Sequence, residues 1–427
     1  MMEIVQETTK LNALTGILGE RYVAEIPKLF EARRSDARKA LETLEFPTTK
    51  QEYWKYTRTG QIANKTWQFA DNFDLPELPV SIEKLSPRMV FVNGVYNEAY
   101  SEMETLKGLE ITQFSKSKKG FISDLEQYID YALSPFLALN TLLPQDGYSI
   151  RVSKNHAIEK PLNIINVYTG DTTISQPRSA VYLEKGAELK ITEFHIHSSK
   201  DPTFSNTALE VQLEANSKLG IDVIQKGNDN SYHLQQLDAV VAGDANFTHN
   251  NFTMRGKWTR NNGNVRLKGS NTTANLNGFY IPNGAEHVDN HTVMDHEQPH
   301  CDSNELYRGV MLGRSSAVFN GKVYVRPHAQ KTNAFQSNGN ILVSDDATVN
   351  SKPELEIYAD DVKCSHGSTT GQIDEEAIYY LRTRGLSAVS ARKMMVGAFA
   401  ADVLNTMVNQ EWREYIEEVI SHELSKA

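Results

Sequence analysis

The chain has 427 residues, of which 40% are apolar and 23% are charged, and its formal net charge is −10. This length predicts two or three domains, and the apolar content argues against wholesale disorder. An acidic chain without long basic runs is not expected to bind nucleic acid. The sequence contains no apolar run of about 18 residues, so we expect no membrane-spanning helix. The start lacks a secretory pattern and only two cysteines occur, which favours a cytoplasmic protein.

The beginning of the chain is predicted to be helical. Apolar residues recur there at spacings of three and four, and the pattern stops at Phe46-Pro47, because proline disfavours helix in the residue before it. A further helix is expected from Ser123, since Ser123 and Glu126 can form a capping box. We therefore assign residues 1–146 to a mainly helical amino-terminal domain.

Asn-Gly pairs mark predicted turns. Asn93-Gly94 lies between the apolar runs 89–92 and 95–96, a strong signal for a two-residue β-hairpin. Further pairs, also interpreted as turns, begin at Asn262, Asn277, Asn283, Asn320 and Asn338.

Residues 147–370 are predicted to form a β-rich core domain. Segments 180–183 and 189–192 are interpreted as strands, in which successive side chains point to opposite faces. Small-residue turns recur about every 30 residues and again after a longer interval, at Gly186-Ala187, Asn216-Ser217, Asp244-Ala245, Thr273-Ala274 and Asp346-Ala347. This spacing favours a coiled β-solenoid, and an antiparallel sandwich is the alternative.

Residues 371–427 are predicted to form a helical carboxyl-terminal domain. Asp374 is a plausible first cap, Gly385 a plausible stop, and Ser387 a cap for the next helix. The apolar stripe of that helix is wide and rich in small residues. It suits a core helix, and a docking surface for another protein is the alternative.

A histidine-rich segment invites a metal interpretation, because imidazole and thiolate are good ligands. It contains His287, His291, His296, His300 and Cys301. On an unbroken strand the first two histidines would face away from the next two. Hydrogen bonding in turns or interfaces is the alternative to metal binding.

Motifs for phosphate loops, dinucleotide binding and serine nucleophile elbows are absent from the sequence. The best remaining candidate for chemistry is the stretch from Glu356 to His366. If this stretch is one strand, Cys364 and His366 share a face about 6.6 Å apart, with Tyr358 and Asp360 further along. Two ligands fall short of a tetrahedral metal site, so a partner chain would have to supply the others.

Several segments resemble the SufB/SufD family of iron–sulfur cluster assembly proteins, in order along the chain from about residue 46 to 405. They are FPTTKQEYWKYT (46–57), SNELYRG (303–309), GKVYV (321–325), ADDVKCSHG (359–367), LRTRGLS (381–387) and Ala398-Phe399. SufB proteins are typically longer and richer in cysteine, so the amino-terminal motif and two thiols favour the SufD branch.

The resemblance implies a mainly β protein with a right-handed parallel β-helix between helical amino- and carboxyl-terminal domains. It implies a non-catalytic scaffold that acts with SufB and the ATPase SufC, and an isolated chain that can form a homodimer. Nascent iron–sulfur cluster or iron would bind transiently at the SufB interface through His366 and Cys364, with no cofactor held stably by this chain alone. The residues expected to dock SufC are Arg384, Gly385, Leu386, Ala391, Met395, Ala398 and Phe399.

A stand-alone enzyme is the competing interpretation. Parallel β-helices also carry carbohydrate-cleaving sites, in which acidic residues gather on one sheet face. The acidic residues available for such a site are Asp289, Asp295, Glu297 and Asp302.

Overall fold

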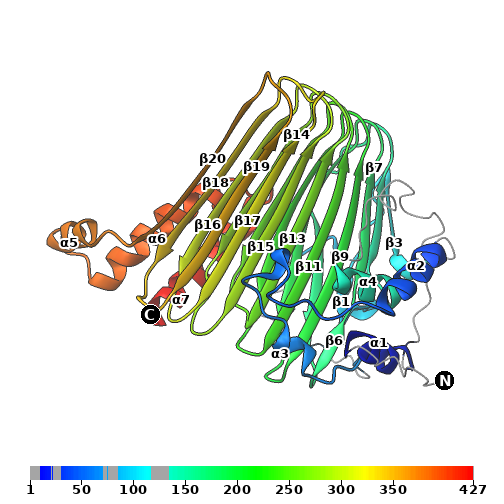
Figure 1. The fold of residues 1–427 in the computed structure, drawn as a ribbon, viewed down its shortest axis with the longest axis horizontal. Helices are drawn as coiled ribbons and strands as arrows, with labels where there is room; N and C mark the ends of the chain where they lie inside the picture. The colour runs from blue at the N-terminus through cyan, green and yellow to red at the C-terminus, as the bar shows by residue number, and fades with distance from the viewer. Residues whose placement is uncertain are drawn as a thin grey trace, which may run out of the picture.

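The computed structural model describes residues 10–20, 22, 30–70, 75, 85–116 and 134–426, and the helix expected from Ser123 lies outside these residues. Two ten-stranded sheets dominate it (Figure 1). Sheet B contains, in spatial order, β2 (Val95–Tyr96), β1 (Arg88–Val92), β5 (Leu162–Tyr168), β8 (Glu188–His197), β10 (Lys218–Lys226), β12 (Asn246–Thr253), β14 (Thr273–Tyr280), β16 (Asp302–Met311), β18 (Asn333–Leu342) and β20 (Lys363–Gln372). Sheet A contains β19 (Thr348–Ile357), β17 (Ser316–Val325), β15 (His287–His296), β13 (Trp258–Leu267), β11 (Ser231–Val241), β9 (Thr203–Leu213), β7 (Arg178–Leu183), β4 (Tyr148–Val152) and β3 (Leu109–Gln113), with β6 (Thr173–Ser175) beside β9.

The chain coils by alternating between the two sheets. From β7 to β20 each strand pairs in parallel with the strand two places later, so that Leu219 of β10 lies beside Phe247 of β12 and Phe247 lies beside Ala274 of β14. Parallel ladders of this kind require the chain to cross over between paired strands. The predicted parallel β-helix is therefore confirmed, and the antiparallel sandwich is excluded.

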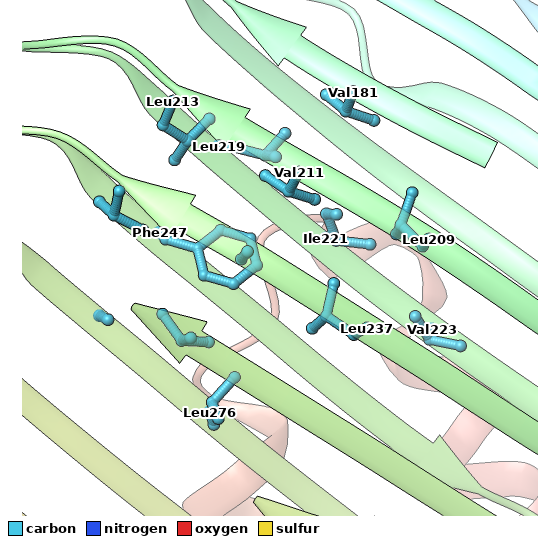
Figure 2. Packing of buried hydrophobic residues seen from close by; sticks show 14 of the residues in the cluster. Val181, Leu209, Val211, Leu213, Leu219, Ile221, Val223, Leu237, Phe247 and Leu276 are labelled. Carbon is cyan, nitrogen blue, oxygen red and sulfur yellow. The ribbon is translucent and has the colours of Figure 1, made fainter. Parts of the chain in front are cut away.

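The main hydrophobic core lies between the two sheets. Alternate residues of each strand point inward, and those of successive turns stack in rows. Figure 2 shows Leu237 beside Leu209 in one row and Phe247 beside Leu219 in another. Complete burial of a side chain of this size contributes roughly 1.5–3 kcal/mol to folding. Repeated over many turns, these rows hold the coil together.

Helices cover the outer faces of both sheets. The amino-terminal helices are α1 (Lys10–Glu20), α2 (Glu31–Leu41), η2 (Glu52–Trp54), α3 (Gly60–Ala63) and α4 (Pro135–Leu142), with short η4 (Glu98–Tyr100) and η5 (Phe114–Lys116). The carboxyl-terminal helices are α5 (Glu375–Thr383), α6 (Ala388–Leu404), η7 (Gln410–Trp412) and α7 (Arg413–Lys426). Each outer face carries a cluster of buried apolar residues. Trp67 and Phe204 belong to the cluster on sheet A, and Phe252 and Val403 belong to the cluster on sheet B. None of the described helices is long and apolar enough to cross a membrane.

The predicted helix ends are partly correct. Asp374 caps α5 by accepting hydrogen bonds from the amides of Glu376 and Ala377, and Ser387 caps α6. The amino-terminal helical pattern, however, ends earlier than predicted: α2 stops at Leu41, before Phe46-Pro47.

The Asn-Gly pairs behave in two ways. Asn93-Gly94 forms the predicted hairpin turn between β1 and β2, with φ values of 51° and 79°, and Asn283-Gly284 is also a turn. The turn prediction is wrong for the other four pairs, which lie inside β13, β14, β17 and β18. Thr273-Ala274 likewise begins β14, and the turn before it contains Asn271, with φ 59°.

The β structure extends on both sides of the predicted core domain 147–370. β1 and β2 join sheet B before it, and β20 continues to Gln372 after it.

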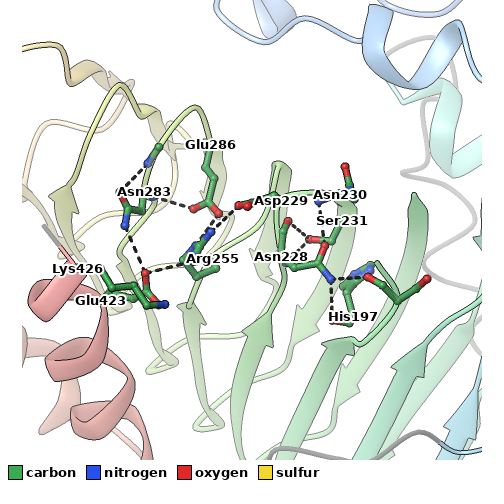
Figure 3. Close-up of polar contacts among 12 residues, drawn as sticks. His197, Asn228, Asp229, Asn230, Ser231, Arg255, Asn283, Glu286, Glu423 and Lys426 are labelled. Carbon is green, nitrogen blue, oxygen red and sulfur yellow. Dashed lines mark hydrogen bonds and ion pairs between the residues drawn. The ribbon is translucent and has the colours of Figure 1, made fainter. Parts of the chain in front are cut away.

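The carboxyl-terminal helices are fixed to the coil by polar contacts as well as by apolar packing. Arg255, at φ 85° in a turn of the coil, bonds Glu286 at 2.6 Å and Glu423 of α7 at 3.2 Å (Figure 3). On β10, the buried Asp222 accepts hydrogen bonds from the amides of Val408 and Asn409 at 3.1 and 2.8 Å. The segment between α6 and α7 is thus held directly against sheet B.

Candidate functional site

The coil has an open end formed by β19 and β20. Each is the last strand of its sheet, so each presents a ten-residue row of backbone groups along an edge that no other described strand pairs with. Most side chains of β20 are exposed. An exposed edge of this length is a natural place for another chain to add its own strands.

Cys364 and His366 lie on the inward side of β20. Cys364 pairs with Ala334, a fully buried inner residue of β18, and packs against the core between the sheets. Alternation along the strand places His366 on the same side, two residues later, where its side chain is exposed at the open end. The predicted shared face of these two residues is therefore present.

The same stretch is not a single strand, which corrects one sequence interpretation. Glu356 belongs to β19 in sheet A, and Tyr358 and Asp360 lie in the turn before β20. The chain changes sheets there, because the solenoid must turn a corner before its last strand.

A row of polar side chains lies behind His366. His366 pairs with Gln336 of β18, which pairs with Glu305 of β16. The Gln336 Nε2 group donates to Glu305 Oε2 at 2.9 Å, and Thr292 Oγ1 donates to the same oxygen at 3.1 Å. Burial raises the pKa of Glu305 to about 7, against the opposite effect of these two donors.

A second polar row lies behind Ser368. Ser368 Oγ donates to Ser351 Oγ of β19 at 2.7 Å, and Ser351 donates to Asn338 Oδ1 at 2.9 Å. Asn338 in turn donates to the buried Tyr280 hydroxyl at 3.2 Å. These bonds connect the two edge strands to each other and to the interior.

The open end carries two possible metal ligands, fewer than a complete metal site needs. Within the described ranges, no three His, Cys, Asp or Glu side chains are grouped so that they could hold a metal ion. Cys364 and His366 together provide two donors of types that bind iron, although burial raises the pKa of the Cys364 thiol. Further ligands would have to come from outside this part of the chain.

The histidine-rich segment is distributed over different faces of the coil. His287 lies on the outer side of β15, between Thr57 and Ser316, and His291 is paired with Asp289 at 3.0 Å. His291 also lines a cavity of about 320 Å³ outside sheet A.

The other members of that segment lie inside the coil or at its rim. His296 points inward and bonds Ser303 at 2.8 Å, whereas His300 is exposed in a turn. Cys301 is fully buried and accepts a hydrogen bond from Thr272. The opposite faces inferred from sequence for His287 and His296 are present, and the segment does not converge on one point.

Comparison with known proteins identifies the chain. The family model for the SUF system FeS cluster assembly SufBD core domain matches residues 166–399, and the model for the SufBD protein N-terminal region matches residues 19–164. The chain belongs to the SufB/SufD family of iron–sulfur cluster assembly proteins. The resemblance noted from the sequence is thereby confirmed.

Individual relatives agree with this SufB/SufD assignment. The iron-sulfur cluster assembly protein SufD of Escherichia coli strain K12 is 30% identical over 403 residues, covering 91% of this chain and 93% of the relative. A SufBD family iron-sulfur cluster assembly protein of Synechocystis sp. strain PCC 6803 is 28% identical, with coverages of 87% and 86%. The chloroplastic protein ABCI7 of Arabidopsis thaliana is 27% identical, with coverages of 89% and 83%. The chain is thus an iron–sulfur cluster assembly protein of the SUF system.

The carboxyl-terminal residues suggested by the SufB/SufD resemblance lie in different environments. Three of them are exposed: Arg384, Gly385 and Ala398. Three are half-buried and pack against the cluster on sheet B: Leu386, Met395 and Phe399. Ala391 is fully buried.

The most exposed apolar groups of this domain are not among the docking residues suggested by the resemblance. They are Tyr379, Tyr380, Val389 and Met394, with exposed fractions of 69%, 57%, 48% and 57%. The available signal was the Tyr-Tyr pair at 379–380, since apolar groups that are exposed together often mark an interaction surface.

Proposed function

We propose that this SufB/SufD family member is a non-catalytic scaffold subunit that holds a nascent iron–sulfur cluster, or its iron, at the open end of the coil. One observation carries the proposal. Cys364 and His366 face the same way on the last strand, at an edge that has no neighbour among the strands described by the structure. Neutral imidazole and thiolate are both iron ligands, and two of them fall short of a complete site.

The partner that completes the site is proposed to be SufB. A related β-helix could extend both sheets by pairing with β19 and β20, and its side chains would then reach the row that contains His366. The half-exposed apolar residues Phe335, Ile357 and Tyr358 near this end would be covered in such a complex. In the absence of SufB, a second copy of the chain could occupy the same edges as a homodimer.

The ATPase SufC is proposed to dock on the carboxyl-terminal helices. α5 projects beyond the coil (Figure 1), and Tyr379, Tyr380 and Met394 expose apolar surface on α5 and α6. The exposed residues Arg384 and Gly385 lie next to this surface. We place the complex in the cytoplasm, where a reducing environment keeps both thiols free.

Movement of SufC on ATP binding would reach the open end through the contacts that fix these helices to sheet B. Asp222 holds the segment between α6 and α7, Arg255 holds α7, and Arg308 of β16 bonds Asp402 of α6 at 3.2 Å. Since β16, β18 and β20 are consecutive in sheet B, displacement of α6 would act on the strands that carry the site. Iron and sulfide would enter or leave in that way.

The structure favours this scaffold over a carbohydrate-cleaving enzyme. Each acidic residue of the enzyme interpretation already has a partner: Asp289 bonds Arg260, Asp295 bonds Arg326, Glu297 bonds Arg266 and Asp302 bonds Asn333. The Arg260 guanidinium and neighbouring histidines hold the pKa of Asp289 well below its usual range, although burial acts to raise it. Asp289 therefore does not suit the acid role in glycoside cleavage, which needs a carboxyl group that keeps its proton near neutral pH.

Replacement of His366 tests the proposal. In a complex reconstituted from this chain, SufB and SufC, we expect His366→Ala to lower the anaerobic yield of iron–sulfur cluster by at least about tenfold, because a ligand is lost. His328→Ala is the matched control, since His328 is an exposed histidine in a turn of the same coil. An unchanged cluster yield in an intact His366→Ala complex would rule out the role.

A further inference from the structure

We infer that Gln336 and Glu305 are positioning residues that orient the His366 imidazole from inside the coil. The inference rests on the proposed role of His366 and extends it by two residues of neighbouring strands. These residues would decide which ring nitrogen of His366 carries the proton, and therefore which one can bind iron.

The register of sheet B brings the three residues together. Glu305, Gln336 and His366 occupy equivalent positions on β16, β18 and β20, so they form one inward-facing row. Adjacent strands lie about 4.8 Å apart, which is within the reach of neighbouring long side chains. Burial decreases along the row: Glu305 is 0% exposed, Gln336 is 3% exposed, and His366 is open to solvent.

Two oxygen atoms in this row have no partner in the described part of the chain. Gln336 Oε1 and Glu305 Oε1 are both buried, and neither has a hydrogen bond among the residues that the structure describes. Leaving a buried acceptor unsatisfied costs roughly 1–3 kcal/mol. Such atoms are therefore unusual in a folded core, and a donor from the next strand would remove the cost.

The bond between Gln336 and Glu305 determines which way the Gln336 amide faces. Its Nε2 group donates to Glu305 Oε2 at 2.9 Å, so its Oε1 atom is on the other side of the amide. The next residue of the row on that side is His366. An N–H of the His366 ring is the donor that this position offers to Gln336 Oε1.

That hydrogen bond would prepare His366 as a ligand. A neutral imidazole has one N–H and one free lone pair, so a donor bond from one nitrogen leaves the other available to a metal. Histidines that bind metals usually make a bond of this kind to a carboxylate or carbonyl oxygen. The inner nitrogen would be fixed by Gln336, and the outer nitrogen would face the opening of the coil.

The tautomer of His366 in the metal-free, full-length chain is the first readout. Nuclear magnetic resonance of isotope-labelled histidine near neutral pH distinguishes the two ring nitrogens, and loss of signals in His366→Ala identifies those of His366. We expect one predominant tautomer in the unaltered chain and a mixture of both in Gln336→Leu. An equal tautomer ratio in the two proteins would overturn the inference.

A matched control separates orientation from loss of packing. Gln225 of β10 is also a buried inward glutamine, and it donates to Gln235 and Asn261 at 2.8 Å. Gln225→Leu makes the same chemical change away from His366, so we expect it to leave the His366 tautomer unchanged. A change as large as that in Gln336→Leu would also overturn the inference.

Two substitutions of Glu305 test its part. Glu305→Gln keeps an oxygen that can accept from Gln336, so we expect one predominant His366 tautomer in this variant. Glu305→Leu removes that acceptor, so we expect a mixture of both tautomers. Equal behaviour of the two variants would contradict the acceptor role. If Glu305→Leu does not fold, Gln336→Leu still tests whether this row of side chains orients His366, through the ratio of the His366 tautomers.

Iron binding is the second readout. In the reconstituted complex we expect Gln336→Leu to weaken Fe²⁺ binding about 10- to 100-fold, as loss of an orienting group does at other metal sites. Unchanged binding would overturn the inference. The tautomer measurement needs no iron, so it fails or succeeds independently of whether His366→Ala lowers the cluster yield.

Discussion

Cys364 and Cys301 show how position in the coil changes the chemistry of one residue type. Cys301 has no exposed surface, accepts a hydrogen bond from Thr272 at 2.9 Å and donates to the Gly269 carbonyl at 3.2 Å. Cys364 lies on the last strand and is only half-buried. Burial raises the pKa of both thiols, and the two thiols differ in their access to solvent.

We therefore expect one fast-reacting thiol in the native chain. A maleimide reagent at neutral pH should label Cys364, and label Cys301 only after unfolding, because no reagent reaches a fully buried sulfur. Mass spectrometry of the labelled chain checks this. Cys364→Ala should abolish the fast reaction, and Cys301→Ala should leave it unchanged. Rapid labelling of two thiols in the folded chain would contradict the assignment.

The sequence predicted part of this site. The alternation of residues 364 and 366 was sufficient to place both side chains on one face. The residues behind them were not predictable, because Glu305 and Gln336 reach His366 only through a pairing register that joins positions about 30 residues apart. No local pattern encodes that register.

At the scale of a strand, glycine makes room for tyrosine in the neighbouring turn. Gly278 of β14 pairs with Tyr307 of β16, and a Cβ atom at Gly278 would lie 2.3 Å from the Tyr307 ring. Gly309 of β16 meets Tyr280 in the same way, at 2.2 Å. These glycines leave room for large rings inside the coil, as glycine often does where another group approaches the backbone closely.

Substitution of one such glycine measures the effect. We expect Gly278→Ala to lower the free energy of unfolding by about 1–3 kcal/mol, since the Tyr307 ring must move in a packed interior. The matched control is Gly263→Ala in β13, where a new Cβ would have its nearest neighbour at 3.9 Å. Urea unfolding followed by circular dichroism compares them. An equal decrease in the free energy of unfolding in both variants would indicate a backbone effect instead of a clash with the Tyr307 ring.

This packing also explains why the turn predictions failed. Asn262-Gly263 and Asn277-Gly278 carry the same dipeptide as the real turn at Asn93-Gly94, yet both pairs lie within strands. The dipeptide reports only that the backbone can form a tight turn. Gly278 instead makes room for the Tyr307 ring of the next turn of the solenoid, which is a contact between distant parts of the sequence. The helix caps Asp374 and Ser387 were predictable because their partners lie within three residues.

Across the whole molecule, the interior of the coil changes from apolar to polar along its strands. Leu189 and Ile191 of β8 are in the apolar core, whereas Glu193 and His195 further along are buried polar residues. Burial lowers the pKa of His197 to about 3 and that of His249 and of His296 to about 4. These histidines are neutral in the folded coil near neutral pH.

Acid should therefore destabilise the fold through these histidines. The pKa values of these histidines in the folded chain lie below the ordinary 6.5. As the pH falls below about 6.5, the histidines therefore become protonated in the unfolded chain and stay neutral in the folded chain. At about pH 5 each histidine would lower the free energy of unfolding by about 2 kcal/mol relative to about pH 7.5. Glu305 and Asp222 act in the opposite direction, because burial raises their pKa values to about 7 and about 6 and protonation then favours the folded state.

Single substitutions separate these opposing contributions. His249→Gln removes one buried imidazole, so the loss of unfolding free energy between about pH 7.5 and about pH 5 should shrink by about 2 kcal/mol. Glu305→Gln removes a group that gains a proton in the folded state as the pH falls. The loss of unfolding free energy between about pH 7.5 and about pH 5 should therefore become larger in this variant. His422→Gln makes the same chemical change at an exposed position of α7 and is the control for the substitution itself. Urea unfolding at both pH values gives all the differences. If His249→Gln followed the pH dependence of the unaltered chain, the buried histidine would not be excluding its proton.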